Sequence, residues 1–140
     1  MKNVKVYLTA LLLSISFLFS NCSKNSNAVV PTEEVLISHL WSIDYYYQNQ
    51  DMTSQFSPYS LIFSSTGAVA GQKGNEYFSG TWTLSVDGNQ HEIVSIHFSP
   101  SEPNLDLLNL DWTLMDKAST TLQFEESNTA TSLRIKILPQ

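Results

Sequence analysis

The 140-residue sequence is poor in the residue types that form disulfides, metal centres and nucleic-acid-binding surfaces. It contains a single cysteine, Cys22, so an internal disulfide is excluded. Its seven lysine and arginine residues stand against thirteen carboxylates. Nucleic-acid binding depends on clustered cations that displace counterions from phosphates, and the sequence has no such cluster. We therefore expect no nucleic-acid partner.

Motifs of catalysis and cofactor binding are also missing. The sequence has no Gly-x-Ser-x-Gly elbow, no phosphate-cradling glycine loop and no His-Glu-x-x-His pair. His91 and His97 lie six residues apart in one expected strand, hence roughly 20 Å apart, which is too far to share a metal ion. Glutamates 33–34 and 125–126 are interpreted as solvated carboxylates. We predict that the protein is not an enzyme and uses no metal or other cofactor.

The amino-terminal segment has the order of a secretory signal. Lys2 and Lys5 precede a stretch from Val6 to Phe19 that is apolar except for one threonine and two serines. As a helix, these fourteen residues would cover roughly 21 Å, which is short of a hydrocarbon core near 30 Å thick. We interpret residues 1–21 as a cleaved signal peptide, not as a membrane span.

Cys22 lies where a signal peptidase would cut, directly after Leu18-Phe19-Ser20-Asn21. The arrangement resembles a bacterial lipobox, whose cysteine takes diacylglycerol and becomes the first mature residue; an incidental cysteine beside an ordinary cleavage site is the alternative. Several acyl chains on one cysteine, palmitate among them, hold a protein firmly to a membrane. We predict lipid attachment at Cys22, a flexible tether over residues 22–32, and an outer-membrane lipoprotein that faces either the periplasm or the cell exterior.

The remaining chain has the size and composition of one globular domain. Removal of residues 1–21 leaves 119 residues, with five cations against thirteen carboxylates and a formal charge of −8. Three Trp, five Tyr and five Phe remain after cleavage, enough with the aliphatic residues to fill a core. An anionic surface disfavours adhesion to anionic lipid headgroups, so the lipid anchor would be the contact with the membrane.

Alternation of apolar and polar residues with a period of two dominates the predicted domain, residues 33–140. The expected strands cover about 41–47, 59–64, 68–70, 77–86, 94–98, 110–114, 122–124 and 133–137. A brief helix over 33–40, capped by Thr32, leads in, and residues 99–109 form a flap with one short helical turn. Short strands joined by local turns, such as the Asp87-Gly88 hairpin, favour an all-β fold: an antiparallel up-and-down barrel of about eight strands.

Tyr45, Tyr46 and Tyr47 form the densest aromatic cluster in the sequence. Strict alternation from Trp41 would send Tyr45 and Tyr47 into the barrel and Tyr46 outward. The ordinary interpretation is two core tyrosines and one exposed strand residue; the functional one is an aromatic platform for a sugar or an apolar ligand, with Trp112 or Phe56 nearby. The candidate ligand-binding residues are Tyr45, Tyr47, Trp82 and Trp112.

Four short segments together resemble a known family. They are Leu40-Trp41-Ser42-Ile43 before the tyrosines, Asp51-Met52-Thr53-Ser54-Gln55-Phe56, Phe78-Ser79-Gly80-Thr81-Trp82 and Leu110-Asp111-Trp112. They are similar to small lipocalin-like lipoproteins of Bacteroidetes, which have calycin-type barrels. The resemblance implies a lipocalin-like barrel domain and supports the fold more than any activity.

Two functions are compatible with these observations. The first is a lipid-anchored, lipocalin-like binding module that takes a small apolar ligand in its mouth, gated by residues 99–109. The second is an envelope protein-protein interaction module with a solid barrel and no ligand. The volume of the interior separates them, because ligand sites usually enclose about 300 Å³ or more.

Overall fold

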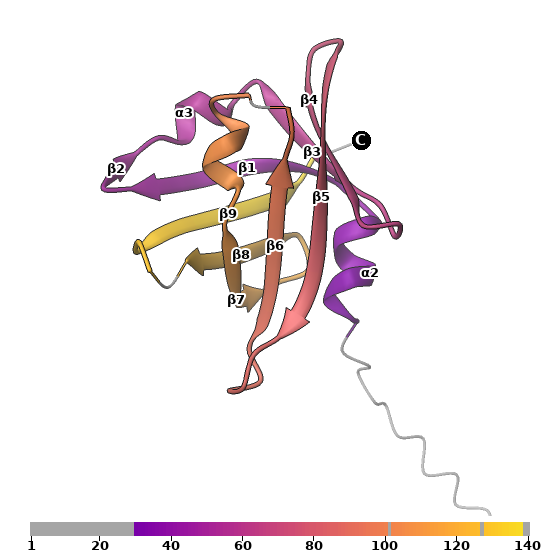
Figure 1. Ribbon diagram of the computed structural model, residues 1–140, viewed down its shortest axis with the longest axis vertical. Helices are drawn as coiled ribbons and strands as arrows, with labels where there is room; N and C mark the ends of the chain where they lie inside the picture. Colours follow the sequence, from indigo (N-terminus) through magenta and orange to yellow (C-terminus); the bar gives the residue numbers. More distant parts are fainter. Residues whose placement is uncertain (1–29, 101, 127, 139–140) are drawn as a thin grey trace, which may run out of the picture.

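The computed structural model describes residues 30–100, 102–126 and 128–138. The predicted signal peptide, Cys22 and most of the predicted tether lie outside these residues. The elements, in chain order, are α2 (Thr32–Ile37), β1 (Leu40–Gln48), β2 (Gln50–Asp51), α3 (Thr53–Phe56), β3 (Tyr59–Phe63), β4 (Ala68–Lys73), β5 (Glu76–Val86), β6 (Glu92–Phe98), η1 (Leu105–Leu108), β7 (Asp111–Lys117), β8 (Thr121–Glu126) and β9 (Thr131–Ile137) (Figure 1). No helix in this part of the chain is long and apolar enough to cross a membrane.

The strands form one antiparallel sheet that closes on itself. Neighbours follow the order β1-β3-β4-β5-β6-β7-β8-β9, and β9 pairs back with β1. That last pairing runs from Trp41 opposite Ile137 to Tyr47 opposite Ser132, along most of β1. The two-residue β2 only extends a hairpin at the end of β1. The predicted antiparallel barrel of about eight strands is confirmed.

Non-strand segments cover both ends of the barrel. At one end α2 contributes Leu36, whose carbonyl accepts a hydrogen bond from Trp41 Nε1 at 2.9 Å. At the other end η1 contributes Leu108, whose carbonyl accepts from Trp112 Nε1 at 3.0 Å. All four side chains are fully buried. We call these two end segments, α2 and η1, the plugs of the barrel. Each buried indole N–H donates to the plug at its own end, and this hydrogen bond fixes the plug to the barrel wall.

The predicted helical turn within residues 99–109 is confirmed as η1, and it packs into the barrel. Leu105 and Leu108 are fully buried. Leu105 lies so close to the backbone of β4 that a Cβ added to Gly71 would come within 2.4 Å of its Cδ1 atom. Glycine at position 71 is therefore what allows Leu105 to fill this space.

The first helix differs from the prediction at its start. α2 begins at Thr32 itself, Pro31 occupies the position before it, and no side chain caps the helix. The Thr32 hydroxyl donates instead to Glu92 Oε2 at 2.6 Å and accepts from Lys117 Nζ at 3.1 Å. The predicted Thr32 cap is thus wrong, because the side chain is buried and hydrogen-bonds to the barrel.

The orientation predicted for the tyrosines is also wrong, and a β-bulge explains why. Ile43 stands opposite Ile135, whereas Tyr45 stands opposite Arg134, so Asp44 is an extra residue in β1. Beyond a bulge, inward and outward positions exchange. Tyr46 is therefore fully buried, and Tyr45 and Tyr47 lie on the outer face of the sheet.

Candidate functional site

The barrel interior is filled by side chains. Its remaining cavity measures about 10 Å³, against the roughly 300 Å³ or more of a typical ligand pocket. The cavity is lined by Leu36, Leu61, Phe63, Val94, Ile96, Trp112, Phe124, Leu133 and Ile135. Leu36 comes from α2, so a segment outside the strands helps to fill the interior. A ligand site, if the protein has one, has to be sought on the outer surface.

The structure separates the four predicted ligand residues into two groups. Trp112 and Trp82 both belong to the core, and the Trp82 indole N–H donates to Ser64 O at 2.9 Å. Tyr45 and Tyr47 lie together on the outside, with their rings within 6° of parallel and their centroids 6.4 Å apart. The predicted neighbours of these tyrosines, Phe56 and Trp112, instead surround the buried Tyr46.

A hollow of about 220 Å³ lies beside the exposed tyrosines, where β1, β9 and β8 are adjacent. Arg134 stands opposite both Tyr45 and Gln123, and Ser132 stands opposite Tyr47. The hollow is lined by Tyr45, Gln123, Ser132, Leu133 and Arg134. We name the outward-facing set Tyr45, Tyr47, Gln123, Ser132 and Arg134 the tyrosine platform.

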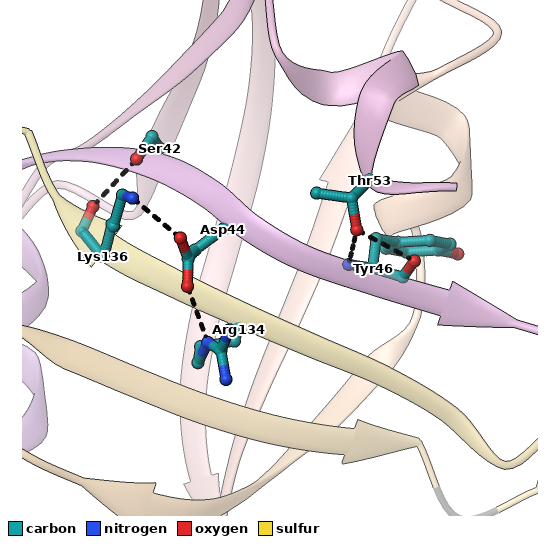
Figure 2. Close-up of polar contacts among 6 residues, drawn as sticks. All are labelled: Ser42, Asp44, Tyr46, Thr53, Arg134 and Lys136. Carbon is teal, nitrogen blue, oxygen red and sulfur yellow. Dashed lines mark hydrogen bonds and ion pairs between the residues drawn. The ribbon is translucent and has the colours of Figure 1, made fainter. Parts of the chain in front are cut away.

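The bulge residue fixes one edge of the platform electrostatically. Asp44 accepts from Arg134 Nε at 2.8 Å and pairs with Lys136 Nζ at 2.7 Å, and Figure 2 shows its carboxylate between the two cations. The hydrogen bond from Lys136, followed by that from Arg134, holds the pKa of Asp44 below its ordinary value against an opposing desolvation. The same Arg134 guanidinium lies over the Tyr45 ring, 5.7 Å from its centroid. Asp44 therefore positions the cation that covers Tyr45.

Tyr46 ties this part of β1 to the core from beneath. Its backbone N–H donates to Thr53 Oγ1 at 3.0 Å (Figure 2), and its phenol donates to Leu107 O at 2.9 Å. Burial raises the pKa of the Tyr46 phenol to about 12. Thr53 is itself held by its N–H bond to Asp51 Oδ1 at 2.9 Å. The strand that carries the exposed tyrosines is thus fixed to η1 and α3.

Sequence reasoning missed the polar half of the platform. Gln123, Ser132 and Arg134 sit at outward positions of β8 and β9, but nothing in their spacing shows which residues of β1 they face. The available signal was weak: Asp44 in one strand and two cations, Arg134 and Lys136, in another. Only the β1–β9 register brings these charges together.

A second hollow on the outer surface is larger, and the exposed ring in its lining is the imidazole of His97, not a phenol or an indole. It measures about 420 Å³ and lies over β5, β6 and β7, with His97 and Asp111 in its lining. Ser95 Oγ donates to Asp111 Oδ1 at 2.5 Å, which occupies part of its polar lining. Its tryptophan, Trp82, is buried. Within the described residues, no group of three or more His, Cys, Asp or Glu side chains could hold a metal ion.

Comparison with known proteins identifies a likeness of fold. No protein-family model matches the chain, and neither does any curated protein. A solved structure that resembles it is the crystal structure of a DUF4847 family protein from Bacteroides vulgatus ATCC 8482, with a TM-score of 0.58 and 17% sequence identity. The match covers 79% of this chain and 99% of that one. The barrel therefore has a counterpart in a Bacteroides protein, in accord with the expected resemblance to Bacteroidetes barrels.

Proposed function

We propose that the protein is a lipid-anchored module of the cell envelope that works through the outer surface of a solid barrel and catalyses no reaction. The observation that carries the proposal is the filled interior, with about 10 Å³ of free space. A small apolar ligand needs an enclosed apolar cavity many times larger. Of the two functions that the sequence left open, the interaction module with a solid barrel is the better supported.

The lipid anchor is the second part of the proposal. Val30 lies eight residue steps after Cys22, and an extended chain covers at most about 3.5 Å per step, so an anchor at Cys22 would hold the barrel within roughly 28 Å of the lipid. The described chain begins next to α2, so the α2 end would lie nearest the membrane (Figure 1). The likeness to a Bacteroides protein supports the barrel fold alone. The lipobox-like segment that ends at Cys22 is what supports placing this lipocalin-like barrel at the outer membrane.

Metabolic labelling tests the anchor. Cells of the native host that express the tagged protein are fed an alkyne analogue of palmitate, and the wild type is compared with Cys22→Ser. We expect label and membrane association in the wild type and neither in the variant, because the variant lacks the acylated thiol. Protease treatment of intact cells then distinguishes an exterior from a periplasmic location. An unlabelled, uncleaved chain in the cytosol would refute the anchor.

Two further measurements test the solid barrel. Native mass spectrometry of the protein purified from its host should show no bound apolar small molecule, because the interior has no room for one. Photo-cross-linkers placed one at a time at outward positions should capture a stoichiometric envelope component from some positions only, in living cells. A small apolar molecule extracted in stoichiometric amounts would instead support the ligand-carrier hypothesis and contradict this proposal.

A further inference from the structure

The tyrosine platform combines an aromatic pair with hydrogen-bonding groups that are left free within the described part of the chain. Among residues 30–100, 102–126 and 128–138, no group hydrogen-bonds the Gln123 amide or the Ser132 hydroxyl. Arg134 uses its Nε for Asp44, which leaves its two terminal NH₂ groups as donors. Amide, hydroxyl and guanidinium therefore surround one hollow that the half-buried Tyr45 ring also lines, and the exposed Tyr47 ring lies next to Tyr45.

This combination matches the chemistry of a sugar ring. A sugar presents a face of C–H groups, which packs on an aromatic ring, and a rim of hydroxyls that both donate and accept hydrogen bonds. Tyr45 and Tyr47 provide nearly parallel rings along one strand, and Tyr47 is 38% exposed. Gln123 and Ser132 can each donate and accept, as sugar hydroxyls require.

The charges around the platform favour a neutral ligand. Arg134 and Lys136 are both paired with Asp44, and Glu125 stands opposite Ser132 at the border of the platform. Two cations and two carboxylates thus balance locally, on a mature chain that is strongly acidic overall. An anionic ligand would find no excess positive charge here.

The platform is shallow, open and held in place. Its hollow of about 220 Å³ is smaller than a drug-sized pocket, which suits one ring of a chain that continues across the surface. Asp44 orients Arg134, and the buried Tyr46 fixes the strand between Tyr45 and Tyr47. Such support lowers the ordering cost of binding.

We propose that the tyrosine platform binds a neutral oligosaccharide, one ring of which packs on the Tyr45–Tyr47 pair while Gln123, Ser132 and Arg134 hydrogen-bond its hydroxyls. The inference goes beyond the proposed function, which requires only that the outer surface of the barrel make contacts.

Calorimetric titration of the purified mature chain tests the inference. The protein is kept in a polyoxyethylene detergent, because maltoside detergents would compete, and is titrated with cellotetraose, maltotetraose, mannotetraose, chitotetraose and tetragalacturonate. We expect at least one neutral tetrasaccharide to bind, and Tyr47→Ala to weaken that binding at least tenfold. Gln123→Ala should weaken it severalfold. Tyr77→Ala, at a 63% exposed tyrosine of β5 outside the platform, is the matched control and should change nothing.

Three results would overturn the inference: no binding by any neutral member, binding that survives Tyr47→Ala unchanged, or preferential binding of tetragalacturonate. Because Tyr47 is at the surface, its variant is expected to fold, and an unchanged urea midpoint verifies this. If cross-linking in cells captures a partner while no sugar binds, the sugar site is refuted and the proposed function stands. An apolar small molecule extracted from the interior would contradict the proposed function. The sugar site is tested independently of that result, by the titrations with tetrasaccharides.

Discussion

Tyr46 makes a pH-dependent contribution to stability that the removal of one hydroxyl can isolate. Its fully buried ring packs on Phe56, with centroids 4.7 Å apart, and its phenol donates to Leu107 O at 2.9 Å. Burial raises the pKa of this phenol from 10.0 to about 12. Tyr46→Phe keeps the ring and removes both the hydrogen bond and the titrating proton.

The two effects have different pH dependence. At pH 7 the phenol is protonated in the folded and unfolded states, so Tyr46→Phe loses one hydrogen bond, about 1 kcal/mol. Above pH 10 the unfolded chain gives up its proton first, so the free energy of unfolding of the wild type falls until the pH passes about 12. At pH 11 this loss is about 1.4 kcal/mol, and the variant does not share it. The two proteins should therefore be almost equally stable at pH 11.

Urea unfolding at pH 7, 9 and 11, followed by tryptophan fluorescence, measures the difference directly. All other tyrosines are common to both proteins, so their ionisation cancels in the comparison. Tyr77→Phe removes a hydroxyl from an exposed side chain and should differ from the wild type by less than about 0.5 kcal/mol at every pH. A Tyr46→Phe difference that is as large at pH 11 as at pH 7 would refute the raised pKa.

Other substitutions test the bulge and the η1 plug by the same unfolding assay. Asp44→Asn should lower the free energy of unfolding by less than about 1 kcal/mol at pH 7, because its partners are partly exposed cations. Since the pKa of Asp44 is lowered on folding, the difference in free energy of unfolding between the wild type and Asp44→Asn should disappear as the pH falls below 3.8 and through the folded-state pKa. A difference that persists below the folded-state pKa would contradict the ion pairs. Leu105→Ala should cost about 3 kcal/mol, as expected for a fully buried leucine. Gly71→Ala alone should lower the free energy of unfolding by about 1 to 2 kcal/mol, because the added Cβ would meet Leu105. In the Leu105→Ala background the same substitution should cost clearly less. Additive effects of the two substitutions would argue against the contact between these residues.

Most of the fold could be predicted from the sequence because the pattern of each strand is local. β5 alternates without interruption, and the Asp87-Gly88 turn joins it to β6, so both strands are found within a residue or two of their predicted ends. Closure of the barrel followed from the number of strands and the short connections between them. These features require no knowledge of which residues lie opposite one another.

The candidate site could not be predicted in the same way, because it depends on register. Residues 41, 43, 45 and 47 are all apolar, and the three consecutive tyrosines fit either orientation, so nothing in β1 itself marks Asp44 as a bulge. The bulge becomes visible only when β1 is aligned with Arg134 and Lys136 of β9. Whether the interior was filled or hollow was left open by the sequence for a related reason, since Leu36 reaches it from a helix outside the strand pattern.

The extra residue in β1 has a consequence for comparing barrels of this type. A relative with the same string of aromatic residues but without an insertion at position 44 would bury the counterparts of Tyr45 and Tyr47 and display that of Tyr46 to solvent. An alignment that pairs these strands letter by letter would then equate a core residue with a surface residue. Corresponding residues of such proteins should therefore be identified from the register of β1 with its partner strand β9, not from the sequence of β1 alone.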